Sequence, residues 1–240
     1  MMKLLIIVPA YNERENIERV IDHLIQDYPQ YSYVVVNDGS KDDTAQICRR
    51  KGYNLIDLPV NLGLAGGFQA GMQYAEKHDF DYAIQYDADG QHRAEYIEKL
   101  LTECEKGQDI VIGSRFAEKK KPLSIRMLGS RLISGAIRIT TFRKIKDPTS
   151  GMRIYNRRMI KLFAHHTNLS PEPDSVAYMI KSGAKVSEVQ VEMDERIAGV
   201  SYFNAPKAMF YMLRMVVSIL FIQVFRSPIR LKDQSPKNEG

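Results

Sequence analysis

The stretch Tyr82-Ala83-Ile84-Gln85-Tyr86-Asp87-Ala88-Asp89-Gly90-Gln91-His92 joins an apolar run of strand length to a polar loop that carries two carboxylates. In α/β sheets, ligands bind beyond the carboxyl ends of buried strands, so this junction is a candidate binding site. Mg²⁺ and Mn²⁺ prefer oxygen ligands and commonly share their coordination shell with substrate phosphates. Asp87 and Asp89 are therefore a candidate metal pair. Asp-x-Asp triplets are common in loops, so the assignment of this pair as a metal site depends on the neighbouring motifs.

Apolar runs alternate with amphipathic helical patterns through the first half of the chain. The predicted strands are Lys3–Val8, Tyr33–Val36, Asn54–Leu58, Tyr82–Tyr86 and Asp109–Ile112, and the predicted helices lie near Glu13–Gln26, Asp43–Lys51, Gly66–Lys77 and Ala94–Lys106. This alternation favours βαβ units and hence a mostly parallel sheet. A chain of 240 residues is long enough to form one large α/β domain with a buried core.

Polar clusters follow four of the predicted strands. They are Pro9–Glu13, Asn37–Lys41, Asn61–Gly63 and Asp87–His92. Because the carboxyl ends of parallel strands meet at one edge of a sheet, these clusters are expected to line a single crevice. The turn Asp38-Gly39-Ser40 has a second explanation, in which Ser40 or Asp42 caps the following helix.

The second half of the chain is less regular. Asp147–Tyr155 is predicted to form a turn that leads into an edge strand, and Val186–Val191 a further strand. Met215–Phe225 is strongly apolar but follows Arg214 and has only eleven residues, so a bilayer span of about 20 residues is not expected. We expect a globular domain over 1–204, an amphipathic membrane-interface or oligomerisation helix over 205–230, and a disordered tail over 231–240.

The net charge of +5 is unevenly distributed. Residues 115–146 contain ten Lys or Arg side chains and one acidic one, and residues 205–240 contain six basic and two acidic ones. These segments carry +9 and +4, so the rest of the chain carries −8. A local basic surface indicates an anionic partner at one place. Nucleic acid is not expected, because only Phe116 and Phe142 interleave the basic run with aromatic side chains.

Five motifs, in chain order, resemble those of family 2 glycosyltransferases, the inverting enzymes of the GT-A group that use nucleotide-diphosphate sugars. They are Pro9-Ala10-Tyr11-Asn12-Glu13, Val36-Asn37-Asp38-Gly39-Ser40, Asn61-Leu62-Gly63, Asp87–His92 and Gly113-Ser114-Arg115, and the resemblance spans residues 3–203. Asp147-Pro148-Thr149-Ser150-Gly151-Met152-Arg153 is similar to the branch that contains dolichyl-phosphate mannose synthase and bacterial polyprenyl-phosphate glycosyltransferases. The resemblance implies a GT-A fold: a mostly parallel sheet flanked by helices, with a Rossmann-like nucleotide half and a C-terminal amphipathic helix.

The resemblance also implies a role for each matching residue. The implied nucleotide-binding residues are Pro9, Tyr11, Glu13, Asp38, Asn61, Gly63 and Asp87. Asp87 and Asp89 would hold Mg²⁺ or Mn²⁺ against the diphosphate, and the implied catalytic residues are Asp89, Gln91 and Arg115. Arg131, Arg153 and Arg196 would contact the acceptor phosphate, with Arg115 nearby.

The chemistry of sugar transfer fits these residue types. Cleavage of the sugar–phosphate bond leaves negative charge on the diphosphate, and a bound cation stabilises that charge without a protonated acid. A phosphate acceptor is already an anion, so arginine forks that position it matter more than a general base. Glu172 and Asp174 lie where hydroxyl-glycosylating relatives carry an acidic base, in a motif altered by Pro173.

Two further side chains have open interpretations. His92 is expected to be a loop residue, and Asp147 either helps to bind the acceptor-side metal or caps a turn.

We therefore expect transfer of N-acetylglucosamine or glucose from a UDP-sugar to undecaprenyl phosphate, for cell-wall or surface polysaccharide synthesis. Two alternatives remain: transfer to a saccharide hydroxyl of a lipid-linked glycan, and a non-catalytic scaffold that binds nucleotide sugars. The expected partners are the nucleotide sugar, the polyprenyl phosphate and the membrane surface, with a membrane-protein subunit or a second copy of the chain as further candidates. The expected location is cytoplasmic, peripheral on the inner face of the cell membrane.

Overall fold

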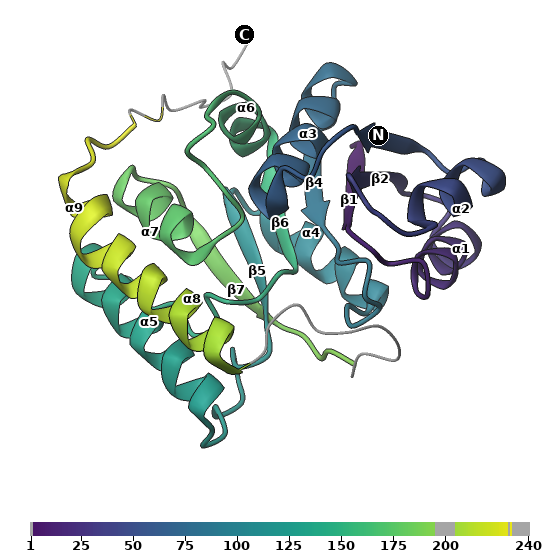
Figure 1. Cartoon of the computed structure of the whole chain (residues 1–240). Helices are drawn as coiled ribbons and strands as arrows, with labels where there is room; N and C mark the ends of the chain where they lie inside the picture. Colours follow the sequence, from purple (N-terminus) through teal and green to yellow (C-terminus); the bar gives the residue numbers. More distant parts are fainter. Residues whose placement is uncertain (1, 195–204, 230, 232–240) are drawn as a thin grey trace, which may run out of the picture.

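The computed structural model describes residues 2–194, 205–229 and 231. In this part of the chain, one mixed sheet has the strand order β3-β2-β1-β4-β6-β5-β7 (Figure 1). The strands are β1 (Leu4–Ala10), β2 (Ser32–Asp38), β3 (Leu55–Leu58), β4 (Tyr82–Gln85), β5 (Ile110–Ser114), β6 (Arg153–Asn156) and β7 (Val186–Gln190). The pairs that β6 forms with β4 and β5 are antiparallel, and the other neighbouring strands are parallel. The mostly parallel sheet predicted from the sequence is confirmed.

Helices cover both faces of this sheet. One face packs against α1 (Ile17–Asp27), α2 (Thr44–Lys51) and α4 (Ile97–Glu105), and the other against α3 (Gly63–Lys77), α5 (Ile125–Thr141), α6 (Arg157–His165) and α7 (Pro173–Lys181). Successive side chains of a strand point to opposite faces. Leu4 and Ile6 of β1 accordingly pack in the first core, and Leu5 and Ile7 in the second. Burial on both faces explains why β1 is a continuous apolar run.

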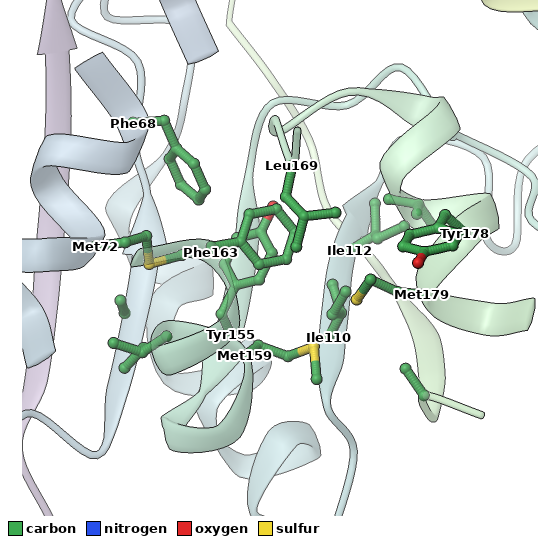
Figure 2. Close-up of a cluster of buried hydrophobic side chains, with 14 of the residues drawn as sticks. Phe68, Met72, Ile110, Ile112, Tyr155, Met159, Phe163, Leu169, Tyr178 and Met179 are labelled. Carbon is green, nitrogen blue, oxygen red and sulfur yellow. The ribbon is translucent and has the colours of Figure 1, made fainter. Parts of the chain in front are cut away.

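Aromatic side chains from three elements meet in the second core (Figure 2). The ring centroids of Phe68 on α3 and Tyr155 on β6 lie 5.3 Å apart, and those of Tyr155 and Phe163 on α6 lie 5.1 Å apart. Tilted and edge-on contacts at this spacing add to the stabilisation from apolar burial. This cluster therefore fixes α3 and α6 against the middle of the sheet.

The prediction that Asp147–Tyr155 leads into an edge strand is wrong. The strand β6 lies in the interior of the sheet, between β4 and β5. Ile154 and Tyr155 are fully buried, and Arg153 is only 1% exposed. An arginine in a central strand is tolerated here because its Nε donates to the Ser150 carbonyl at 2.9 Å and its Nη2 to the Pro148 carbonyl at 2.7 Å. The edge strands are β3 and β7.

The helices and strands predicted in the first half are present, with boundaries that differ by up to four residues. Helix α1 begins at Ile17 because the preceding residues form a turn, in which the amides of Asn16 and Ile17 donate to the Glu13 carbonyl at 2.9 Å. Helix α3 begins at Gly63, three residues earlier than predicted. Helices α5, α6 and α7 lie outside the predicted elements.

The C-terminal segment forms a nearly continuous helix along α5 (Figure 1). It comprises α8 (Ala205–Val217), a π-helical turn (Ser218–Ile222) and α9 (Gln223–Phe225). Gly129 of α5 permits the close approach, since a Cβ there would lie 1.8 Å from the Met212 sulfur. Among the described helices, none has the length and apolar character needed to cross a bilayer.

Gly71 allows α3 to pack closely against β1. A Cβ at Gly71 would lie 2.4 Å from Cγ2 of the buried Ile7. We expect Gly71→Ala to lower the free energy of unfolding by about 1–3 kcal/mol through overpacking, as measured by urea denaturation. Gly135→Ala is the control, because nothing lies within 4 Å of its added Cβ and alanine favours the helix. Equal stabilities of the two variants would contradict this packing.

Candidate active site

The strand order brings three of the predicted polar clusters to one edge of the sheet. Strands β2, β1 and β4 are neighbours and run parallel, so the loops that follow them lie side by side. The fourth cluster, Asn61–Gly63, leads into α3 beside β2. The predicted convergence of the four clusters is therefore present.

Hydrogen bonds join the loop after β1 to the loop after β2. The Asn12 amide donates to Ser40 Oγ at 3.0 Å, and the Lys41 amide donates to Asn12 Oδ1 at 2.8 Å. The Glu13 amide donates to Thr44 Oγ1 at 2.9 Å. These contacts hold the segment that bears Pro9, Tyr11 and Glu13, whose side chains are partly exposed at this edge.

Asp38 fastens the start of α3 to the end of β2. Its carboxylate is 5% exposed, and its Oδ1 accepts the Leu62 amide at 2.7 Å. Asn61 Nδ2 donates to the Asp38 carbonyl at 3.1 Å, and Asn61 Oδ1 accepts the Gly63 amide at 3.2 Å. Gly39 is required between them, because it has φ +63 and its Cβ would lie 2.6 Å from the Asn61 nitrogen. Asp38 thus has a structural role beside the expected nucleotide contact.

Hydrogen bonds within the acidic loop after β4, and one to Asp194, hold this loop in place. Gln85 Nε2 donates to Asp87 Oδ1 at 2.9 Å, and the Gln91 amide donates to Asp89 Oδ1 at 3.1 Å. The Gln91 carbonyl accepts the Asp194 amide at 2.9 Å. Asp87 and Asp89 are both partly exposed, so a ligand can reach this loop.

The donor set of this loop fits a cation that is shared with a phosphate ligand. Within the described residues, no three or more His, Cys, Asp or Glu side chains are grouped so as to hold a metal. Mg²⁺ rarely uses an all-protein cage and is commonly bound by one or two carboxylates together with substrate phosphates. Asp87 and Asp89 supply such a pair, and phosphate oxygens and water would complete the shell.

His92 is more than the loop residue expected from the sequence. Its ring is buried, and Nδ1 accepts the Asp87 amide at 2.9 Å. The ring hydrogen must then reside on Nε2, which lies 3.5 Å from Asp87 Oδ2. The Tyr86 hydroxyl donates to the His92 carbonyl at 2.5 Å. His92 therefore braces both the backbone and the carboxylate of Asp87.

The turn before β6 closes on the same carboxylate. A Cβ at Gly151 would lie 2.6 Å from Asp87 Oδ2 and 3.3 Å from His92 Cε1. Only a glycine permits the turn to approach the acidic loop this closely.

Arg115 and Asp147 form a two-pronged ion pair next to the end of β5, which is separated from β4 by β6. Arg115 Nε and Nη2 donate to the two Asp147 carboxylate oxygens at 2.8 Å each, and the Arg115 amide donates at 3.0 Å. Asp147 is fully buried, and Glu188 accepts its amide at 2.7 Å. Asp147 therefore orients Arg115. It also begins the turn that follows, in which its Oδ1 accepts Thr149 Oγ1 at 3.4 Å and its carbonyl accepts the Ser150 amide at 3.2 Å.

A basic cluster, which consists of Arg115, Lys121 and Arg131, borders the start of α5. Lys121 Nζ donates to Ser130 Oγ at 2.8 Å and to Ser134 Oγ at 3.3 Å, and Arg131 Nη2 donates to the Lys121 carbonyl at 2.8 Å. Burial lowers the pKa of Lys121, while the carboxylates of Asp147 and Glu188 oppose this shift. A nearby anion favours the charged form of an ammonium, so a bound phosphate would stabilise the charged Lys121 side chain.

The three arginines expected to contact the acceptor phosphate differ in their surroundings. Arg153 lies inside the sheet and braces the Pro148–Ser150 turn, and its contact with an acceptor stays a prediction. Its Nη1 has no hydrogen-bond partner among the described residues. Arg196 lies outside the described residues. Arg131, a member of the basic cluster, is exposed, and its contact with the acceptor stays a prediction.

The two acids considered as a general base differ in their surroundings. Asp174 Oδ2 accepts Ser218 Oγ at 2.7 Å and Gln223 Nε2 at 3.5 Å, which ties α7 to the C-terminal helix. Glu172 Oε2 accepts Ser170 Oγ at 3.0 Å and lies 3.7 Å from Arg214 Nη2. Asp174 thus has a structural role.

The sequence patterns did not single out Lys121 or the two serines beneath it. The run Lys119-Lys120-Lys121 is a signal for a basic loop, but only the fold shows that its last member turns inward onto α5.

The contact between His92 and Asp87 is expected to control metal affinity. In His92→Ala, the Asp87 amide loses its acceptor and the carboxylate its brace, so we expect Mn²⁺ affinity in the presence of UDP to fall about 10–100-fold. His92→Asn should retain most of the affinity, since its Oδ1 can replace Nδ1. Isothermal titration calorimetry measures both. Unchanged affinity in a folded His92→Ala protein would contradict the bracing role.

A family model described as "Glycosyl transferase family 2" matches residues 5–163 of this chain. The chain is 29% identical over 230 residues to the polyprenol monophosphomannose synthase of Mycolicibacterium smegmatis, a match that covers 87% of this chain and 84% of that protein. It is also 29% identical over 215 residues to a dolichyl-phosphate beta-glucosyltransferase of Trichomonas vaginalis, which covers 80% of this chain and 66% of that protein.

A solved structure of low sequence identity has the same fold. It is glucosyl-3-phosphoglycerate synthase from Mycobacterium tuberculosis in complex with Mn²⁺, UDP and phosphoglyceric acid. The TM-score is 0.66 at 16% sequence identity, and the match covers 94% of this chain and 80% of that one. At this identity the likeness concerns the fold alone, and the expected GT-A architecture is confirmed. With the family model matching well over half of its length, this chain belongs to glycosyltransferase family 2.

Proposed function

We propose that this glycosyltransferase transfers a hexose from a nucleotide-diphosphate donor to a polyprenyl phosphate. The observation that carries the proposal is the placement of acidic and basic side chains in loops at the same edge of the sheet. Asp87 and Asp89 follow β4, and the basic cluster follows β5. Strand β6 lies between β4 and β5, so a donor and an anionic acceptor would bind side by side.

On the donor side, the carboxylate pair would bind a divalent cation, Mg²⁺ or Mn²⁺, against the diphosphate. A bound cation supplies charge stabilisation to the departing nucleoside diphosphate. The braces from Gln85 and His92 hold Asp87 in place before the donor arrives, so little reorganisation is needed during the reaction. Pro9, Tyr11, Glu13, Asp38, Asn61 and Gly63 would surround the nucleotide.

On the acceptor side, the basic cluster would orient a phosphate. A phosphate oxygen is already an anionic nucleophile, so attack at the sugar carbon requires no general base. Asp174 is engaged by Ser218 and Gln223, which agrees with a reaction that does not rely on that carboxylate. Gln91 and Arg115 would position the sugar and the acceptor phosphate.

The relatives favour mannose or glucose as the transferred sugar. Their names specify a monophosphomannose synthase and a beta-glucosyltransferase, and both names specify a polyprenol or dolichyl phosphate. The expectation of N-acetylglucosamine has no support from them. Undecaprenyl phosphate as acceptor, UDP as the nucleotide, a role in cell-wall or surface polysaccharide synthesis, and a peripheral location on the cytoplasmic face of the membrane remain parts of the proposal.

Asp89 provides the test of the donor side. With labelled GDP-mannose, UDP-glucose or UDP-N-acetylglucosamine, undecaprenyl phosphate and Mn²⁺, we expect a single-sugar lipid product from one of the hexose donors. Asp89→Asn should lower turnover by about 10²-fold or more, because one charge of the cation pair is lost. Asp27→Asn, on the exposed end of α1, is the control. Label found only in glycans longer than one sugar would favour the hydroxyl acceptor instead.

Lys121 provides the test of the acceptor side. Lys121→Gln removes one charge from the basic cluster, so we expect the KM for polyprenyl phosphate to rise about tenfold while the KM for the donor changes little. Lys120→Gln, an exposed neighbour, should leave both constants unchanged. A rise confined to the donor KM would contradict the assignment of this cluster to the acceptor.

A further inference from the structure

Exposed apolar side chains gather on one part of the molecule. Among the described residues, 17 large hydrophobic side chains are exposed, and 12 of them lie on α5, on the C-terminal helix or at the ends of α5. The twelve are Leu123, Leu128, Leu132, Ile139, Phe142, Met209, Phe210, Leu213, Val217, Phe221, Ile222 and Phe225. We call them the apolar plate. Single exposed hydrophobic residues are ordinary, but a contiguous patch of this kind marks an interaction surface.

The two helices that carry the plate pack against each other. They lie side by side along the edge of the molecule (Figure 1), in contact where Gly129 meets Met212. The inner side of the C-terminal helix is fastened to α7, since Ser218 donates to Asp174 and Lys181 Nζ donates to the Gln223 carbonyl at 2.9 Å. The exposed residues are therefore the outer side of a docked helix pair.

The two chain segments that carry the plate are basic. Residues 119–146 contain nine Lys or Arg side chains and no Asp or Glu, and residues 205–232 contain five and none. Arg131 and Arg138 are exposed on α5, Arg143 is exposed just after it, and Arg214 is exposed on α8, 3.7 Å from Glu172 of the neighbouring α7 segment. Apolar side chains on segments of this charge complement an anionic lipid surface, which attracts Lys and Arg and accepts apolar side chains below its headgroups.

We propose that the apolar plate docks on an anionic phospholipid bilayer, an inference that rests on the proposed function and names the surface through which it is carried out. A second copy of the chain is a poorer occupant, because a symmetric contact would bring the two basic borders together. The same helix, α5, carries Ser130 and Ser134 beneath Lys121. Docking by α5 therefore brings the basic cluster to headgroup level, where the phosphate of a polyprenyl lipid resides.

Vesicle co-sedimentation tests the docking without substrate. We expect the full chain to bind vesicles of mixed phosphatidylcholine and phosphatidylglycerol, to bind phosphatidylcholine alone much more weakly, and to dissociate at high salt. The double variant Leu132→Gln/Ile139→Gln should bind about tenfold or more weakly, while Ile25→Gln on the exposed side of α1 should bind like the parent. Equal binding by the double variant and the parent would overturn the proposal, and so would equal binding to neutral vesicles.

Fluorescence supplies a second readout that does not depend on the glutamine variants. The chain contains no tryptophan, so Phe142→Trp and Phe210→Trp each provide a single reporter on the plate, and Ile25→Trp a control. We expect brominated acyl chains to quench the two plate reporters and not the control. Absence of quenching would overturn the proposal. It would also be overturned if the parent chain did not bind vesicles but formed a dimer, seen by light scattering, that the double variant abolished. Neither assay uses a sugar donor. Failure of the proposed sugar transfer can therefore be told apart from failure of membrane docking.

Discussion

The parallel pairing of β1 with β2 on one side and with β4 on the other constrains everything at the site. Three strands that run in the same direction must release their loops at the same edge, and in this chain each of those loops is polar. The loops are then fixed to one another: Asn12 and Ser40 join the first two, and Asp38 with Asn61 holds the start of α3. The acidic loop after β4 therefore lies at the same edge of the sheet as these joined loops.

The antiparallel strand β6 completes this arrangement from the other direction. Because β6 runs against β4, the turn that precedes it lies at the same edge as Asp87, and Gly151 lets it approach closely. The next loop belongs to β5 and carries the basic cluster, with Asp147 orienting Arg115. One reversed strand thus lies between the acidic loop and the basic cluster at the same edge of the sheet, the arrangement on which the proposed transfer from a cation-bound donor to an anionic acceptor depends.

The convergence of the polar loops at one edge of the sheet was predictable from sequence because its determinants are local. Buried parallel strands are continuous apolar runs, and their polar loops follow at once. The position of β6 was not predictable from sequence, because Arg153 and Pro148 are typical of an exposed edge strand. Only the folded turn supplies the carbonyls that accept hydrogen bonds from the Arg153 guanidinium. Lys121 was missed for a similar reason, since its partners Ser130 and Ser134 lie on a helix that the patterns did not predict. The transferred sugar depends on a few contacts that no motif encodes.

The central claim is that Asp87 and Asp89 hold a divalent cation against the diphosphate of the donor. The most direct measurement is anomalous diffraction from crystals of the protein grown with Mn²⁺ and UDP. The account predicts a manganese peak that bridges these carboxylates and the diphosphate oxygens, with His92 still in contact with the Asp87 amide. A well-occupied UDP without a manganese peak at these side chains would contradict it.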